Sequence, residues 1–357
     1  MSRSFSNVLV TGGAGFIGSN FIRYLLGRPE FMGRIMNYDI LTYAGNLNNL
    51  SDIVARYGGE RYSFILGDIC DQAKLDSVFD EYNIDAVVHF AAESHVDRSI
   101  HDPSSFIRTN VLGTQVLLDV ARRKWTGRND VLFHHISTDE VYGSLGDEGA
   151  FKEDTPYDPR SPYSASKAAA DHLVMAYWHT YGLPVTLSNC SNNYGPYQFP
   201  EKLIPLIIGN IEKRKQLPIY GDGLNVRDWL YVGDHNSAVW MIMRDGRLGQ
   251  KYNIGGETEW ENLRLVKALC EIYSEESGGE IHDALKLIAF VKDRPGHDRR
   301  YAIDCTKLKS ELGWRQSVSI NEGLRVTVQW YLDNRSWTEN IQSGGYRDWI
   351  ELNYGKR

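Results

Sequence analysis

Two short motifs near the middle of the chain carry side chains that can move protons. Tyr163 and Lys167 lie four residues apart in a segment predicted to be helical, so their side chains share one helix face. An ammonium group beside a phenol stabilises the phenolate and lowers the phenol's pKa from about 10. The pair therefore predicts a base that removes a proton from a hydroxyl group while a hydride leaves the adjacent carbon.

The second motif, Thr138-Asp139-Glu140, follows an apolar run and adds two carboxyl groups. A carboxylate can remove a hydrogen next to a ketone, and a protonated carboxyl group can protonate a departing hydroxyl. Two carboxyl groups in different environments can divide these roles, one ionised and one protonated. The motif therefore indicates elimination of water. The alternative is an acidic loop at a strand end, which would be favoured without Tyr163 and Lys167.

A glycine-rich turn near the N-terminus predicts a dinucleotide site. The apolar run 8–11 leads through Gly12, Gly15 and Gly18 into a helical pattern. Glycines allow a tight turn and a close approach of the backbone to pyrophosphate, and the helix N-terminus supplies N–H groups. Asp39 lies 21 positions after Gly18, where its carboxylate suits ribose hydroxyls and repels a 2′-phosphate. This favours NAD over NADP. The alternative is a turn that serves fold geometry only.

The elements that must position these motifs alternate between strands and helices. We expect strands at 7–10, 34–38, 62–66, 86–90, 132–137 and 185–189, and helices at 18–26, 74–82, 103–123 and 162–181. This alternation predicts an α/β fold with a Rossmann-type, doubly wound parallel sheet. Ser161 is the expected N-cap of the last helix, and Pro162 its first residue.

After residue 189 the alternation ends, and a stretch rich in Gly, Pro, Tyr and Asn follows, with a helical pattern near 203–213. We expect residues 1–190 plus about 227–256 to form the NAD-binding domain. Residues about 191–226 plus 257–357 are expected to form a smaller α/β lobe that covers the open end of the sheet, and the family resemblance given by the motifs as a whole implies that this lobe binds a nucleotide sugar.

Composition excludes several classes. A formal charge of -7 and a pI near 5.8 argue against a nucleic-acid groove. No apolar run approaches the roughly 20 residues of a membrane helix, and the N-terminal apolar run ends at the glycine cluster as a strand would. The four cysteines are far apart, which predicts reduced thiols and a cytoplasmic protein. The histidines match no metal triad, so we expect no metal.

Together these motifs resemble the extended branch of the short-chain dehydrogenase/reductase superfamily, and within it the dTDP-glucose 4,6-dehydratase family. The resemblance covers essentially the whole chain and includes the segments 39–46, 91–97 and 191–197. It implies conversion of dTDP-glucose into dTDP-4-dehydro-6-deoxyglucose by C4 oxidation, loss of water across C5 and C6, and hydride return to C6. Such a lyase would serve deoxysugar nucleotide biosynthesis, for example of rhamnose.

The resemblance implies roles for single residues. Tyr163 would be the base at O4, Glu140 would remove the C5 proton and Asp139 would protonate the C6 oxygen, while Thr138 can hydrogen-bond O4. The expected NAD contacts are Gly12, Gly15, Phe16, Ile17, Gly18, Asp39, Leu41, Thr42, Gly45, Asp68, Ile69, Phe90, Ala91, Ala92, Thr109, Tyr163, Lys167 and Asn193. The expected nucleotide-sugar contacts are Ser94, Thr138, Asn192, Glu201, Lys202, Leu203, Pro218, Tyr220, Arg227, Asn253, Arg294 and His297. Arginine suits a diphosphate, although Arg227 and Arg294 would also fit surface ion pairs.

Several alternatives stay open. A UDP-glucose 4,6-dehydratase differs only in lacking one methyl group on the base, which is worth about 1–3 kcal/mol. Asp139 and Glu140 argue against another extended-family epimerase or a decarboxylase. A non-catalytic NAD sensor would tolerate loss of Tyr163, Lys167 or Glu140, and all are present. The helices 103–123 and 162–181 are expected to pair in a homodimer, unless both simply pack on their own sheet.

Overall fold

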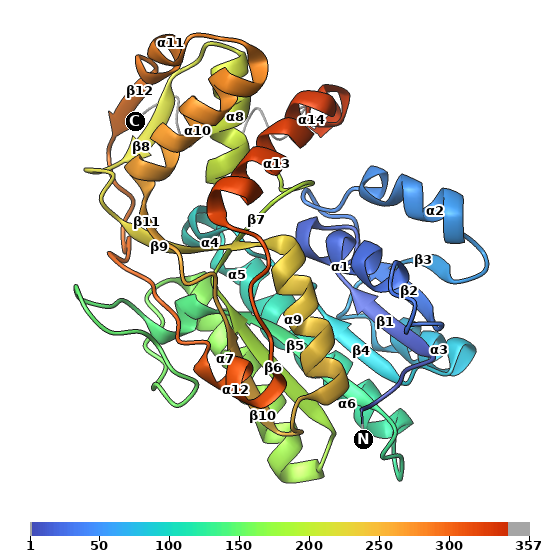
Figure 1. Cartoon of the computed structure of the whole chain (residues 1–357). Helices are drawn as coiled ribbons and strands as arrows, with labels where there is room; N and C mark the ends of the chain where they lie inside the picture. The colour runs from blue at the N-terminus through green and yellow to red at the C-terminus, as the bar shows by residue number, and fades with distance from the viewer. Residues whose placement is uncertain (1, 342–357) are drawn as a thin grey trace.

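Seven parallel strands form the central sheet of this computed structural model, which describes residues 2–341 (Figure 1). The strand order is β10-β6-β5-β4-β1-β2-β3. The bounds are β1 Asn7–Thr11, β2 Arg34–Asp39, β3 Tyr62–Leu66, β4 Ala86–His89, β5 Leu132–Thr138, β6 Val185–Cys190 and β10 Gln250–Ile254. The chain builds outward from β1 on one side and from β4 on the other, so a crevice forms at the carboxyl ends of these two neighbours.

Helices cover both faces of this sheet, as its buried strands require. Along β1, Val8 and Val10 belong to one hydrophobic cluster and Leu9 to the other, because successive side chains point to opposite faces. The helices are α1 Phe16–Leu26, α2 Ser51–Tyr57, α3 Gln72–Tyr82, α4 Val96–His101, α5 Pro103–Phe106, α6 Thr114–Lys124, α7 Pro162–Tyr181 and α9 Val232–Asp245.

A second group of elements has its own hydrophobic core, which includes Ile207, Leu265 and Leu324, and gathers at one end of the central sheet (Figure 1). Its strands are β7 Asn192–Tyr194, β8 Leu217–Tyr220, β9 Val226–Tyr231, β11 Glu259–Glu261 and β12 Ile288–Val291. Its helices are α8 Leu203–Glu212, α10 Asn262–Ser277, α11 Ile281–Leu285, α13 Ile320–Asp333 and α14 Arg335–Ile341.

The fold class expected from the sequence is confirmed. Strand β10 pairs with β6, so the chain returns to the central sheet after it has formed strands β7, β8 and β9 of the second group. Helix α12 (Thr306–Leu312), within the range expected for the smaller lobe, packs against β10 and α9 instead. The domain boundaries stay a prediction, and their last part, residues 342–357, lies outside the described residues.

The single helix expected over residues 103–123 is wrong in detail. Between α5 and α6 the chain forms a π-helix, Ile107–Gly113. The carbonyl oxygen of Asn110 accepts a hydrogen bond from the hydroxyl of Thr114 at 2.6 Å. Within this wider turn Asn110 is buried, and its side-chain nitrogen donates to the Glu93 carbonyl oxygen at 3.0 Å and to the Ser166 hydroxyl at 2.9 Å.

Candidate active site

A cavity of about 500 Å³ opens at the carboxyl ends of the central strands. Its lining contains the residues that follow β1, β3 and β4 and those that end β2, β5 and β6. Every residue predicted to be catalytic lines it: Thr138, Asp139, Glu140, Tyr163 and Lys167. So do all the predicted NAD contacts except Leu41, and the predicted substrate contacts Ser94, Asn192, Glu201 and Lys202.

The glycine turn leaves a cradle for a phosphate group. Gly12 has φ +71°, and a Cβ there would lie 2.6 Å from the backbone nitrogen of Ala91. Helix α1 begins at Phe16 with Gly15 as its N-cap, and no side chain caps it. Its first N–H groups are therefore left for an anion, as a pyrophosphate site requires.

The acid at the end of β2 shapes the loop beside this turn. Asp39 Oδ2 accepts a hydrogen bond from the Ala14 N–H at 2.9 Å, and Oδ1 accepts one from the Leu41 N–H at 2.8 Å. Leu41 has a positive φ of 57° and lies outside the cavity lining, and its contact with NAD stays a prediction. At the next strand exit, Asp68 pairs with Arg108 at 2.7 Å.

Helix α7 carries the predicted base. The Ser161 hydroxyl accepts a hydrogen bond from the Ser164 N–H, the Ser164 hydroxyl accepts one from the Ser161 N–H, and Pro162 is the first helical residue, as expected. This start places Tyr163, 8% exposed, and Lys167, 4% exposed, at the cavity wall.

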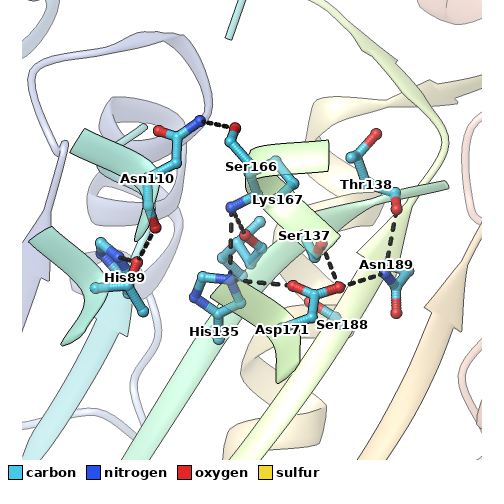
Figure 2. A network of polar contacts seen from close by, with 12 residues as sticks. His89, Asn110, His135, Ser137, Thr138, Ser166, Lys167, Asp171, Ser188 and Asn189 are labelled. Atoms are coloured by element: carbon cyan, nitrogen blue, oxygen red, sulfur yellow. Dashed lines mark hydrogen bonds and ion pairs between the residues drawn. The ribbon is translucent and has the colours of Figure 1, made fainter. Parts of the chain in front are cut away.

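In the protein chain by itself the pKa of Tyr163 is raised, and the lowering effect expected of Lys167 stays a prediction. Burial raises the pKa of Tyr163 well above its usual value, and the nearby Glu140 carboxylate raises it further. The ammonium of Lys167 instead donates to the carbonyl oxygen of Ile136 at 2.7 Å. Figure 2 shows Lys167 turned toward β5, in a polar network with His135 and Asp171.

The carboxyl pair is placed by the end of β5. Thr138 is the N-cap of the 3₁₀ turn Asp139–Tyr142, where its hydroxyl accepts the Glu140 N–H at 3.3 Å and donates to Asp139 Oδ1 at 3.3 Å. Asn189 on β6 donates to the carbonyl oxygen of Thr138 at 3.1 Å (Figure 2). These bonds fix the direction in which both carboxyl groups enter the cavity.

The two carboxyl groups have different electrostatic surroundings. Burial raises the pKa of Asp139 well above its usual value, and the charges of Glu140 and Asp228 add to this effect. Burial also raises the pKa of Glu140, but Arg294, Arg227 and Lys202 all lower it. Asp139 is therefore the group that holds a proton, and Glu140 is the more acidic of the two.

The three cations come from the second group of elements or from its edge. Lys202 lines the cavity and donates to the Ser94 carbonyl oxygen at 3.1 Å. Arg227 donates to the Asp298 carbonyl oxygen at 2.9 Å, and Arg294 pairs with Asp97 at 3.3 Å. The predicted substrate contacts that do not line this cavity are Leu203, Pro218, Tyr220, Arg227, Asn253, Arg294 and His297.

The prediction that Asn253 contacts substrate is not supported by its position. Asn253 is completely buried on β10. Its side-chain oxygen accepts a hydrogen bond from the Tyr142 hydroxyl at 2.9 Å, and its side-chain nitrogen donates to the Phe151 carbonyl oxygen at 3.0 Å. Both ends of the amide are therefore engaged within the protein, away from the cavity.

Several lining residues were not predicted as contacts: Tyr43, Glu93, Arg108, Cys190, Gln198 and Phe199. Tyr43 and Glu93 fall inside the sequence segments that carry the family resemblance, so that signal was available. Among the described residues, the side-chain oxygens of Asn192, Asn193 and Gln198 are buried without a hydrogen-bond partner. A buried acceptor left unpaired costs stability, and all three of these residues line the cavity.

Two classes of feature are missing from residues 2–341. No cluster of three or more His, Cys, Asp or Glu side chains there is arranged to hold a metal ion. No helix in this part of the chain is both long and apolar enough for a membrane span. All four cysteines lie in this part and are free.

Comparisons with known proteins agree with this geometry. The family model described as GDP-mannose 4,6 dehydratase matches residues 9–327. A dTDP-glucose 4,6-dehydratase of Salmonella typhimurium is 51% identical, over 98% of this chain and 99% of that protein. The dTDP-glucose 4,6-dehydratase of Bacillus anthracis, solved in complex with NAD, is 46% identical with a TM-score of 0.84, over 94% of this chain and 99% of that one. The Streptomyces venezuelae enzyme, solved with NAD and TYD bound, has 45% identity and a TM-score of 0.85 over the same shares.

Proposed function

This chain belongs to the dTDP-glucose 4,6-dehydratase family, and from that premise we propose that it converts dTDP-glucose into dTDP-4-dehydro-6-deoxyglucose and water, with NAD as cofactor. The observation that carries the proposal is the meeting of Tyr163 with two unlike carboxyl groups, Asp139 and Glu140, in one cavity beside the glycine turn. An epimerase has no use for a buried acid and a buried base in addition to the tyrosine.

The residues around the turn fit NAD. The uncapped N-terminus of α1 and the cradle at Gly12 suit a pyrophosphate, and Asp39 stands where ribose hydroxyls would lie. Asn193 offers an unpaired oxygen on the same wall. Bound NAD would supply an acceptor for the C4 hydride and return that hydride to C6.

The chain's own groups would handle the protons. Tyr163 would take the O4 proton as C4 is oxidised, and a positively charged ring beside it would oppose the rise in its pKa caused by burial. Glu140, whose three neighbouring cations oppose the rise in its pKa caused by burial, would remove the C5 proton and later restore it. Asp139, held protonated, would give its proton to the departing C6 hydroxyl.

The test is incubation of the purified protein with dTDP-glucose, and separately with UDP-glucose, in the presence of substoichiometric NAD. We expect a product lighter by one water with dTDP-glucose, detected by mass spectrometry, and no lasting NADH absorbance. Accumulation of an oxidised sugar together with an equal amount of NADH would contradict the proposal. Equal kcat/KM for both nucleotides would contradict the choice of thymidine.

We also propose that the protein is a cytoplasmic homodimer that supplies deoxysugar nucleotide biosynthesis. Free cysteines suit a reducing compartment. The dimer is supported by exposed apolar side chains on α4, the π-helix and the end of α7: Ile100, Ile107, Leu112 and Tyr181, of which Ile107 is 52% exposed. Ile107 and Leu112 lie within the helical segment expected to pair, and apolar groups exposed there suit a surface that a partner covers.

A further inference from the structure

Asp171 is a buried carboxylate on α7, one turn after Lys167, and it is bonded to several neighbouring elements (Figure 2). Its Oδ1 lies 3.2 Å from His135 Nε2 on β5. The donors to its Oδ2 are Ser137 Oγ at 2.8 Å, Tyr157 OH at 2.9 Å and Asn189 Nδ2 at 3.3 Å. These bonds and the positive charge of Lys167 hold the pKa of Asp171 below its usual range despite burial.

Lys167 needs such a group because its ammonium is buried. Burial lowers the pKa of Lys167, and Asp171 is the first of the groups that raise it. Within residues 2–341, no carboxylate forms a direct ion pair with the Lys167 Nζ, which lies 2.7 Å from the Ile136 carbonyl oxygen and 3.5 Å from His135 Nε2. His135 therefore lies between the ammonium and the carboxylate. A buried cation without a compensating charge loses its proton or destabilises the fold.

The other titratable groups around this pair do not supply a negative charge at neutral pH. Burial lowers the pKa of His135 on β5 to about 4, and lowers that of His89 on β4 well below its usual value, so both rings are neutral. Burial raises the pKa of the Cys190 thiol on β6 to about 12. Burial also raises the pKa of the phenols Tyr142, Tyr157 and Tyr163, and Lys251 on β10 adds a second cation near Asp171.

We propose that Asp171 is a positioning residue that supplies the buried negative charge for Lys167 and joins α7 to the end of β5. The first role is electrostatic and acts across the neutral ring of His135, which lies 3.5 Å from the Lys167 Nζ and 3.2 Å from Asp171 Oδ1. The second acts through Ser137, which precedes Thr138, and through Asn189, which bonds both Asp171 and the Thr138 carbonyl oxygen. One carboxylate thus connects the helix that carries Tyr163 and Lys167 to the strand end that carries Asp139 and Glu140. The kinetic consequence of this inference rests on the proposed function.

The test is Asp171→Asn, which removes the charge with almost no change in shape. We expect the rate of C4 oxidation to fall roughly 10–100-fold, the range that follows from misplacement of a catalytic group, while KM for the sugar nucleotide changes little. The alkaline limb of the kcat–pH profile should move to lower pH, because Lys167 then loses its proton more easily. A profile that stays in place would overturn the proposal.

The matched control is Asp234→Asn. Asp234 is 2% exposed on α9 and accepts hydrogen bonds from Ser317 and Val318, with no lysine among its bonded partners in the described chain. Its loss should lower stability without moving the alkaline limb. This comparison separates a specific effect on Lys167 from the general cost of changing a buried carboxylate.

A second measurement needs no activity. If Asp171→Asn leaves Lys167 uncompensated, the double variant Asp171→Asn/Lys167→Met should unfold at a higher urea concentration than Asp171→Asn alone. Additive destabilisation by the two substitutions would contradict the charge pairing. This comparison decides the inference even if Asp171→Asn folds poorly or if wild-type protein fails to dehydrate dTDP-glucose, in which case only the proposed function falls.

Discussion

Asp139 and Glu140 are neighbours in sequence, yet their charges have different partners. Burial and the Glu140 carboxylate keep a proton on Asp139, while Glu140 is near Arg294, Arg227 and Lys202. Two carboxyl groups so close cannot both ionise cheaply, and the cations determine which one does. The assignment of Asp139 as acid and Glu140 as base therefore has a physical reason beyond resemblance.

Glu140→Gln tests this assignment. Loss of the general base should slow release of water by roughly 10²–10⁴-fold, while hydride transfer from C4 continues because Tyr163 is unchanged. In a stopped-flow experiment with dTDP-glucose, NADH absorbance should rise and then persist. Glu148→Gln, in an exposed loop, removes the same charge and should behave as wild type. Equal loss of NADH formation and product formation in Glu140→Gln would show that Glu140 serves oxidation as well.

Part of this site can be predicted from sequence, because strand ends can be located. Thr138, Asp139 and Asp39 directly end apolar runs, and parallel strands bring their carboxyl ends to one edge. The partner of Lys167 was not predictable in this way. It depends on how deeply α7 packs against β5, which brings His135 and Asp171 together and turns Lys167 away from a simple pairing with Tyr163.

At the scale of elements, the turn between β1 and α1 brings the chain very close to the exit of β4. Gly12 and Gly59 both have left-handed backbones, with φ +71° and +77°. A Cβ at Gly12 would lie 2.6 Å from the Ala91 backbone nitrogen, whereas nothing lies within 4 Å of a Cβ at Gly59. The two positions therefore separate the cost of backbone conformation from the need for close approach.

Gly12→Ala should weaken NAD binding by at least about 10-fold, which corresponds to about 1.4 kcal/mol, because β4 must shift and the phosphate cradle with it. Gly59→Ala should lower the free energy of unfolding by about 1–2 kcal/mol, the cost of a left-handed alanine, and leave NAD affinity unchanged. Calorimetric titration of NAD and urea unfolding measure the two effects. An unchanged NAD affinity in Gly12→Ala would refute the role given to this turn.

The helices and strands were easier to predict from the sequence than the irregular segments and side-chain bonds that connect them. The periodic apolar pattern of the first 190 residues predicts the strands and helices of the sheet, but it does not indicate the π-helix Ile107–Gly113 that interrupts the helix expected over residues 103–123. Likewise, the sequence does not indicate that the Asn253 amide bonds Tyr142 and Phe151, which are far away in sequence. Propensity and periodicity carry no information about such long-range side-chain bonds.

For the whole molecule, the proposed dimer predicts that Leu112→Glu raises the dissociation constant by at least about 10-fold, since a carboxylate would be buried in an apolar interface. Leu112 is 48% exposed on the π-helix. Met32→Glu is the matched control, because Met32 is 78% exposed outside the proposed interface helices. Analytical ultracentrifugation measures both. A wild-type protein that sediments as a monomer at all concentrations would contradict the dimer itself.

The buried histidines make the stability of the folded protein depend on pH. Burial lowers the pKa of His89 and His134 well below the usual value, and lowers those of His135 and His235 to about 4. The unfolded chain binds these protons below about pH 6.5, while the folded chain binds them only at lower pH, which is near pH 4 for His135 and His235. Between these values the unfolded state holds more protons, so each histidine makes the free energy of unfolding fall as the pH falls, by at most about 1.4 kcal/mol per pH unit.

Buried carboxyl groups with raised pKa act in the opposite direction, and Asp228, whose pKa burial raises to about 6, is one of them. The net dependence of the free energy of unfolding on pH is therefore the difference between the histidine and carboxyl contributions. The contribution of a single histidine is best measured by substituting that residue. His235 is completely buried on α9. His235→Leu should flatten the fall in urea stability between pH 6.5 and pH 4.5 by up to about 1.4 kcal/mol per pH unit, while His179→Leu on the exposed end of α7 should not. Equal slopes in wild type and His235→Leu would mean that His235 binds its proton equally well in the folded protein.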